Sequence, residues 1–311
     1  MKKLLLLFSV MLLLVLAGCN KDEAIEPNNE ATDKLTVYTT VYPLLYFTEK
    51  IGGDYVDAQT IYPNGADEHT YEPTQKEMID IAKADLFFYI GQGLEGFVDK
   101  ALETLKNEKV DFVATAEHLD LSEEAAHTDD HDHDGHNHGD FDPHVWLNPL
   151  MSIELAKEIT VSLSEKSPEH KAYFESNLAT LTEQLEALDN EFSTTLASLP
   201  KKQFIVTHAA YSYWERYGIE QVSISGMDSS SEPSQKKLQE IIELAKETNT
   251  KYVFIEQNTS SKLTETVKHE INGESLLLHN LSVLTEDDVK NNEDYFTLMR
   301  KNLANLAIAL Q

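Results

Sequence analysis

Cysteine is almost absent from this 311-residue chain, which contains only Cys19. One thiol cannot form a disulfide within the chain, so no internal cross-link holds the fold together. A lone cysteine in such a chain therefore needs another explanation, and its position near the N-terminus supplies one below.

Basic residues are also few. The chain has 25 lysines and arginines against 54 aspartates and glutamates, which gives a formal charge of −29 at pH 7. Binding to nucleic-acid phosphates needs the opposite sign, so we expect no nucleic-acid partner. An acidic surface attracts cations instead. The length is sufficient for two domains of ordinary size.

Long apolar runs are missing except near the N-terminus. Two lysines precede an apolar run at 4–16, a pattern typical of a secretory signal and too short to span a bilayer as a helix. Residues 16–19, Leu-Ala-Gly-Cys, resemble the bacterial lipobox, in which the cysteine is lipidated and becomes the first mature residue. We therefore expect an extracytoplasmic protein, lipid-anchored to the bacterial cell membrane through Cys19. The alternative is a plain signal peptide with an incidental cysteine.

Strand and helix patterns alternate from residue 35 onwards. The nearly continuous apolar run at 85–90 is typical of a parallel strand covered on both faces, and the apolar spacing at 42–51 predicts a helix. The same alternation returns after residue 200. The predicted fold class is α/β, with two (β/α) lobes that contain parallel-type sheets.

One long amphipathic helix is predicted between the two lobes. Apolar residues recur there at steps of three and four: Phe174, Leu178, Leu181, Leu185, Leu188, Phe192, Leu196 and Leu199. A helix over 168–199 would reach roughly 48 Å, which is long enough to brace two lobes. A dimerising coiled coil is the alternative for this stripe, but lobe packing explains it equally well, and we expect a monomer.

These patterns predict five segments. They are a lipoprotein signal peptide at 1–18, a flexible tether at 19–34, an N-terminal α/β lobe at 35–165, a linking helix at 166–199 and a C-terminal α/β lobe at 200–311.

A histidine-rich run interrupts the first lobe at 127–138. Histidine alternates there with Asp, Asn and Gly, and no apolar residue is available for burial, so we expect a mobile loop. Imidazoles and carboxylates suit zinc, which suggests weak metal collection. A passive low-complexity insertion is the alternative. The histidines are His127, His131, His133, His136 and His138.

Three further histidines stand where predicted strands or loops end. His69 follows a strand at 57–62, His208 follows a strand at 203–207, and His144 lies between two prolines beside a tryptophan. Ligand sites in α/β sheets lie beyond the carboxyl ends of the strands. Neutral imidazole is a good zinc ligand, and four-coordination leaves one position for a carboxylate or water. Taken alone, each could also be a satisfied structural histidine.

Three motifs carry a family resemblance. They are Glu-His-Thr-Tyr-Glu-Pro at 68–73, Asp-Pro-His-Val-Trp-Leu-Asn-Pro at 142–149 after the histidine-rich loop, and Thr-His-Ala-Ala at 207–210. From about residue 35 onwards the chain resembles the solute-binding lipoproteins of zinc ABC importers, the cluster A-I (family 9) metal-binding proteins of the ZnuA/AdcA type. The resemblance implies two lobes joined by a rigid helix, with a metal site between the lobes and a membrane permease as partner.

The resemblance also implies a ligand set. The three histidine ligands of the family fall on His69, His144 and His208. Manganese-binding relatives usually have a carboxylate at the position of His208, so histidine there favours zinc.

The fourth ligand is left open. Some zinc-binding relatives have a glutamate two residues before the Leu-Thr-Glu element, but Ser282 occupies that position here. Glu68 or a water is the expected substitute. Glu256 is a further possibility for the fourth position, although a place behind the ligands is favoured for it. Glu256 and Asp228 are otherwise interpreted as buried or capping carboxylates.

The expected function is capture of Zn²⁺ outside the cytoplasm, with high affinity, and its delivery to the permease of an ABC importer, without enzymatic activity. A manganese receptor of the same family is one alternative. A zinc-dependent hydrolase is another, because three histidines with an open position can activate water. The chain has no His-Glu-x-x-His pattern and no obvious general base, which disfavours the hydrolase. Cell adhesion as a secondary role has no signal in the sequence.

Overall fold

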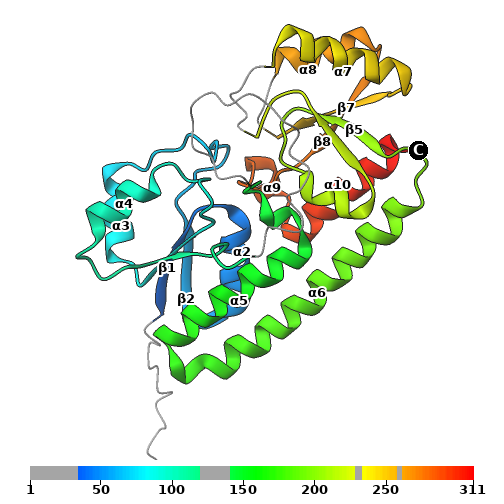
Figure 1. Cartoon of the computed structure of the whole chain (residues 1–311). Helices are drawn as coiled ribbons and strands as arrows, with labels where there is room; N and C mark the ends of the chain where they lie inside the picture. Colours follow the sequence, from blue (N-terminus) through cyan, green and yellow to red (C-terminus); the bar gives the residue numbers. More distant parts are fainter. Residues whose placement is uncertain (1–33, 120–140, 228–232, 258–260) are drawn as a thin grey trace, which may run out of the picture. The chain divides into compact units, whose positions relative to one another are not determined.

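Two four-stranded parallel sheets with helices packed against them form the framework of the molecule (Figure 1). The structure is a computed structural model and describes residues 34–119, 141–227, 233–257 and 261–311. The strand order is β2-β1-β3-β4 in the first sheet and β6-β5-β7-β8 in the second. Every strand pair is parallel, so the predicted α/β class with two parallel-sheet lobes is confirmed.

The strands of the first sheet are β1 (Leu35–Thr39), β2 (Val56–Thr60), β3 (Leu86–Tyr89) and β4 (Asp111–Ala114), and those of the second are β5 (Gln203–Val206), β6 (Glu220–Ser223), β7 (Tyr252–Glu256) and β8 (Glu274–Leu278). The α-helices are α2 (Tyr42–Gly52), α3 (Gln75–Lys83), α4 (Val98–Leu105), α5 (Pro149–Lys166), α6 (Lys171–Ala197), α7 (Gln235–Glu247), α8 (Lys262–Glu270), α9 (Glu286–Lys290) and α10 (Tyr295–Ala309). Short 3-10 helices occur at η1 (Gly53–Tyr55), η2 (Val145–Leu147), η3 (Pro168–His170) and η4 (Ser212–Tyr217).

The long helix predicted from the apolar stripe is present. It begins as the 3-10 turn η3 and continues as α6, and six of its eight stripe residues are fully buried. Near its start, Asn177 Nδ2 donates to the carbonyl of Ile51 at 2.9 Å. Near its end, the ring of Phe192 packs against Trp214, with ring centroids 5.6 Å apart. The helix therefore contacts both lobes, with α5 doubling back beside it (Figure 1).

One large hydrophobic core contains residues of both lobes. The C-terminal helix α10 contributes to it by reaching into the first lobe, where Tyr295 stacks on Tyr46 with ring centroids 6.1 Å apart. The Tyr295 hydroxyl donates to the carbonyl of Trp146 at 2.7 Å. A smaller cluster around Ile241 and Val253 lies under α7 and α8. The shared core makes the two lobes mechanically interdependent.

The short helix after β5 is of the 3-10 type. Residues Ser212–Tyr217 form η4, and Gly218 in the left-handed conformation (φ 76°) ends it. The tight turn points the side chains of Ser212, Tyr213 and Trp214 at the first lobe, where each donates a hydrogen bond. Three tertiary bonds outweigh the intrinsic preference for an α-helix.

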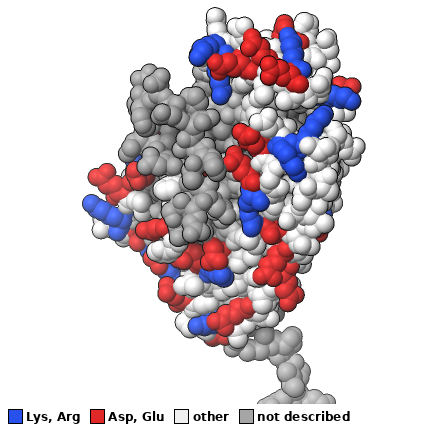
Figure 2. Space-filling view, turned by 45° about the vertical axis from the view of Figure 1, so that its right-hand side comes forward, with Lys and Arg blue, Asp and Glu red and all other residues white. Residues whose placement is uncertain are grey.

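Acidic and basic side chains are interspersed on the face shown in Figure 2. Arg300 on α10 donates from Nε and Nη2 to Glu191 on α6, at 2.8 and 3.0 Å. Both side chains are about half exposed, so the pair stabilises the fold by less than about 1 kcal/mol.

Several predicted features lie outside the described residues. They include the signal peptide, Cys19, nearly all of the tether, the five loop histidines and Asp228. Among the described residues, no helix combines the length and apolarity needed to cross a membrane. The domain boundaries given above stay predictions.

Candidate metal centre

His144 is fully buried, immediately before η2. Its Nδ1 lies 2.7 Å from Oδ1 of Asp142, and the same oxygen accepts the backbone N–H of His144 at 2.9 Å. A carboxylate partner places the imidazole hydrogen on Nδ1, which leaves the lone pair on Nε2. The side chain of Ser212 and the hydroxyl of Tyr213, both from η4, also bind Asp142. Asp142 of the first lobe therefore orients this ring, and residues of the second lobe hold Asp142 in place.

His208 follows β5, and it is 2% exposed. Because β5 and β7 are neighbouring parallel strands, their carboxyl ends meet, and Glu256 at the end of β7 contacts Nδ1 of His208. The Nε2 atoms of His208 and His144 lie 3.4 Å apart. Two nitrogens bound to one tetrahedral zinc at 2.0–2.1 Å are about 3.3–3.4 Å apart, so this spacing already fits zinc.

The loop after β2 supplies the other two donors, Glu68 and His69. Oδ1 of Asp67 accepts the backbone N–H groups of His69 and Thr70, at 3.0 and 3.1 Å, and this turn orients both side chains. The centroid of the His69 ring lies 5.3 Å from the ring centroid of His144 and 6.2 Å from that of His208. Glu68 is only 5% exposed, whereas His69 is half-buried.

These four residues form one cluster. A ligand atom from each of Glu68, His69, His144 and His208 lies within 4.8 Å of all the others, and no other such cluster of three or more occurs in the described ranges. Three imidazoles and one carboxylate are a donor set typical of zinc. The structure therefore brings together the four residues that the sequence predicted, from both lobes. Glu256 lies behind His208, as expected.

Ser282 does not provide a ligand atom in this cluster, but it supports one. Its hydroxyl donates to Oε2 of Glu68 at 2.9 Å, and Nδ2 of Asn280 donates to Oε1 at 3.0 Å. The residue at the position of the missing glutamate thus orients a different carboxylate. Sequence analysis missed Asn280, because no local pattern links it to residues more than 200 positions away.

Burial and charge shift the proton affinity of two cluster members. Burial raises the pKa of Glu68, although His144 and His208 partly offset this effect. Burial opposes protonation of His208, but Glu256, Glu68 and Asp142 outweigh it and raise the pKa of this imidazole. Protons therefore compete with a cation here, and metal binding must release them.

A small cavity of about 20 Å³ borders the least buried member, His69. Phe141, Pro143 and the turn at 92–94 contribute to its walls. A cavity of this size has room for about one water molecule, so it cannot admit a hydrated ion without movement. A bound cation would be shielded from solvent.

Comparison with known proteins gives a consistent result. A family model described as zinc-uptake complex component A, periplasmic, matches residues 37–309. The zinc-binding lipoprotein AdcA of Streptococcus pneumoniae serotype 4 is 38% identical over 97% of this chain and 60% of its own length. The high-affinity zinc uptake system protein ZnuA of Bacillus subtilis is 34% identical over 93% of this chain and 92% of its own length. The chain thus spans about 60% of the AdcA sequence.

Solved structures are similar over the same region. The Zn(II)-bound ZnuA-like domain of S. pneumoniae AdcA superposes with a TM-score of 0.75 at 35% identity, covering 89% of this chain and 99% of the domain. The laminin-binding protein Lmb of Streptococcus agalactiae, described as bifunctional with adhesin and metal-transporting activity, gives 0.78 at 27% identity, covering 89% and 100%. From the extent of the family match, the chain belongs to the family of periplasmic zinc-uptake complex component A.

Proposed function

We propose that this protein is an extracytoplasmic zinc receptor that captures Zn²⁺ and delivers it to the membrane permease of an ABC importer. The observation that carries the proposal is the buried cluster of Glu68, His69, His144 and His208, with two ring nitrogens already at the spacing of zinc ligands. Family membership supports the same cargo and the same kind of partner.

The cluster suits capture better than catalysis. With Glu68 as fourth ligand, all four tetrahedral positions are filled by the protein, so no metal-bound water remains to act as a nucleophile. Because the ligands come from both lobes, release of the ion requires the contacts between the lobes to loosen. This arrangement favours a receptor over a zinc hydrolase.

The first expected result concerns metal selectivity. The purified protein, stripped of metal and offered equimolar Zn²⁺ and Mn²⁺, should retain zinc, because three imidazoles favour zinc whereas manganese prefers oxygen ligands. Elemental analysis after desalting measures the retained metal. Preferential retention of manganese would instead support the manganese receptor.

A second expected result concerns the fourth ligand. Glu68→Gln keeps the side-chain volume but removes the charge, and zinc affinity should fall by at least the roughly tenfold to hundredfold typical of residues behind metal ligands. Competition with a chromophoric chelator measures the affinity. Glu103→Gln, at an exposed position of α4, is the matched control and should bind as the unchanged protein does. An unchanged affinity in Glu68→Gln would assign the fourth position to water.

Attachment to the membrane through Cys19 and weak metal collection by the loop at 127–138 belong to the same proposal. Sequence supports both, through the lipobox-like ending and the five histidines. The named relative AdcA is a lipoprotein, which agrees with an anchor. We also propose that the receptor acts as a monomer.

Cell adhesion is a second candidate function. The likeness to Lmb, a laminin-binding adhesin that also transports metal, is the observation that favours it. Zinc capture remains the primary proposal, because the buried cluster accounts for it directly.

A further inference from the structure

The segment 279–282, immediately after β8 of the second lobe, contacts the first lobe at the metal cluster, where Asn280 and Ser282 both donate to Glu68. Leu281 within it is fully buried and has a positive φ of 62°, a conformation costly for a branched side chain. The carbonyl of Ser282 accepts the N–H of Tyr42 at 2.8 Å, which ties the segment to the start of α2. Such strain persists only where many surrounding contacts fix the backbone, and the neighbouring residues of this segment make such contacts.

Asn280 lies at the centre of this segment and is only 6% exposed. Its Nδ2 donates to Oε1 of Glu68 at 3.0 Å and to Oε2 of Glu256 at 3.1 Å. Both hydrogens of one amide group are therefore directed at two buried carboxylates. Glu256 in turn contacts Nδ1 of His208. Asn280 thus contacts one candidate ligand, Glu68, directly, and it contacts a second, His208, through Glu256.

An amide suits this position electrostatically. Glu68 and Glu256 are both buried and share this amide group, so two carboxylate charges there repel each other. Two N–H donors bind both without adding charge, whereas an ammonium would compete with the cation and a third carboxylate would add repulsion. Hydrogen bonds to charged groups are also stronger than bonds between neutral groups.

The amide is itself braced from several directions. Gln257 accepts the backbone N–H of Asn280 at 3.0 Å and donates back to Oδ1 of its side chain. The backbone N–H of Ser282 also donates to Oδ1, at 3.0 Å, and the hydroxyl oxygen of Ser282, whose one hydrogen is directed at Glu68, lies 2.9 Å from Oδ1. Nε1 of Trp146, two residues after His144, donates to the carbonyl of Asn280 at 2.7 Å. The amide group of Asn280 is therefore held in one orientation, with its two N–H groups directed at the two carboxylates.

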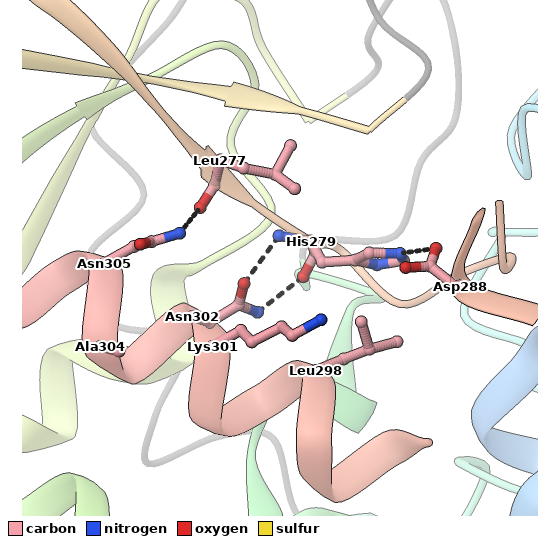
Figure 3. A pocket seen from close by; sticks show the side chains of 8 residues that line it. All are labelled: Leu277, His279, Asp288, Leu298, Lys301, Asn302, Ala304 and Asn305. Atoms are coloured by element: carbon pink, nitrogen blue, oxygen red, sulfur yellow. Dashed lines mark hydrogen bonds and ion pairs between the residues drawn. The ribbon is translucent and has the colours of Figure 1, made fainter. Parts of the chain in front are cut away.

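The preceding residue anchors the segment to the C-terminal helix. Figure 3 shows His279 clamped by Asn302 of α10, which accepts its N–H at 2.7 Å and donates to its carbonyl at 2.8 Å. His279 Nε2 also lies 3.0 Å from Oδ2 of Asp288. These polar groups around the cavity of about 290 Å³ bind one another. These residues therefore attach the segment to α9 and α10, and we do not interpret the cavity as a second ligand site.

We propose that Asn280 is a positioning residue that sets the geometry of two zinc ligands at once, Glu68 directly and His208 through Glu256. The inference rests on the proposed zinc function and assigns the coupling between these two ligands to one amide group. Its effect on affinity should exceed what the loss of contact with Glu68 alone would cause.

The test compares zinc affinity in full-length variants by chelator competition. Asn280→Ala should lower affinity roughly tenfold to hundredfold, as for other residues that orient metal ligands. Loading with Co²⁺ gives a second readout, because its visible absorption bands report coordination geometry, and they should shift in Asn280→Ala. Asn305→Ala removes an exposed amide that donates to the carbonyl of Leu277 (Figure 3), and it should leave both measurements unchanged.

A double-variant comparison separates direct positioning from general damage. In the Glu68→Gln background, Asn280→Ala should still lower affinity, because it also releases Glu256 behind His208. If Asn280→Ala lacks cooperative thermal unfolding, Gln257→Ala removes only the brace and should shift affinity and the Co²⁺ spectrum in the same direction.

The outcomes distinguish the two proposals. Tight zinc binding by the unchanged protein, with the same affinity and Co²⁺ spectrum in Asn280→Ala, overturns the positioning role alone. Absence of tight zinc binding in the unchanged protein overturns the zinc function and the positioning role together.

Discussion

Replacement of His208 by alanine is expected to lower zinc affinity by about two to three orders of magnitude. Four ligands together supply roughly 10–16 kcal/mol in structural zinc sites, so each contributes on average about 2.5–4 kcal/mol. His208 is the cluster histidine that comes from the second sheet, and its Nε2 lies 3.4 Å from that of His144. Its loss therefore removes a ligand and one of the connections between the lobes.

Competition with a chromophoric chelator measures this effect. The matched control is His269→Ala, which removes an exposed imidazole on α8 and should leave affinity unchanged. Affinity in His208→Ala equal to that of the control would remove His208 from the ligand set.

The second large effect is expected on stability. Trp146→Ala should lower the free energy of unfolding by about 3–5 kcal/mol, the range for large aromatic residues in a packed core. Trp146 is fully buried, and its Nε1 donates to the carbonyl of Asn280. The variant therefore creates a cavity and also deprives a buried carbonyl of its donor.

Chemical denaturation of the metal-free protein measures the loss. Trp146→Phe is the informative companion, because it keeps most of the ring volume and loses the N–H donor. It should cost about 1–3 kcal/mol, the penalty for an unsatisfied buried acceptor. Equal losses in both variants would show that the hydrogen bond, rather than packing, dominates.

The sequence predicted the architecture well where burial leaves a strong pattern. Strand β3 is apolar throughout because both faces of its sheet are covered, and α6 has an apolar stripe because it lies along the core. The three histidines stand where strands or loops end, which is where α/β folds place ligands, and the family resemblance grouped them as one ligand set.

Other elements gave weaker signals. Strand β6 is only partly buried, with a polar sequence, and α8 fully buries only Thr264 and Val267. Neither carries enough apolar residues for a period to be recognised. The helix α9 is five residues long, too short for a pattern. These elements depend on tertiary contacts that no local window contains.

The surroundings of the metal cluster were the hardest to predict. Glu68 could be proposed because it adjoins His69, but its contact with Asn280 depends on how the two lobes pack. Likewise, α10 was assigned to the second lobe, yet Tyr295 stacks on Tyr46 of α2. Such pairings follow from the packing of whole elements, for which a single sequence contains no direct signal.

The sequence separation of these contacts has a consequence for folding kinetics. Ser282 and Glu68 are 214 positions apart, and the Tyr46 hydroxyl bonds Asp294 across 248 positions. Contacts between such distant residues form late, since the entropy of closing the intervening chain must be lost before they contribute. We therefore expect the complete ligand set to form near the end of folding, so that zinc binds a folded chain and does not nucleate its folding.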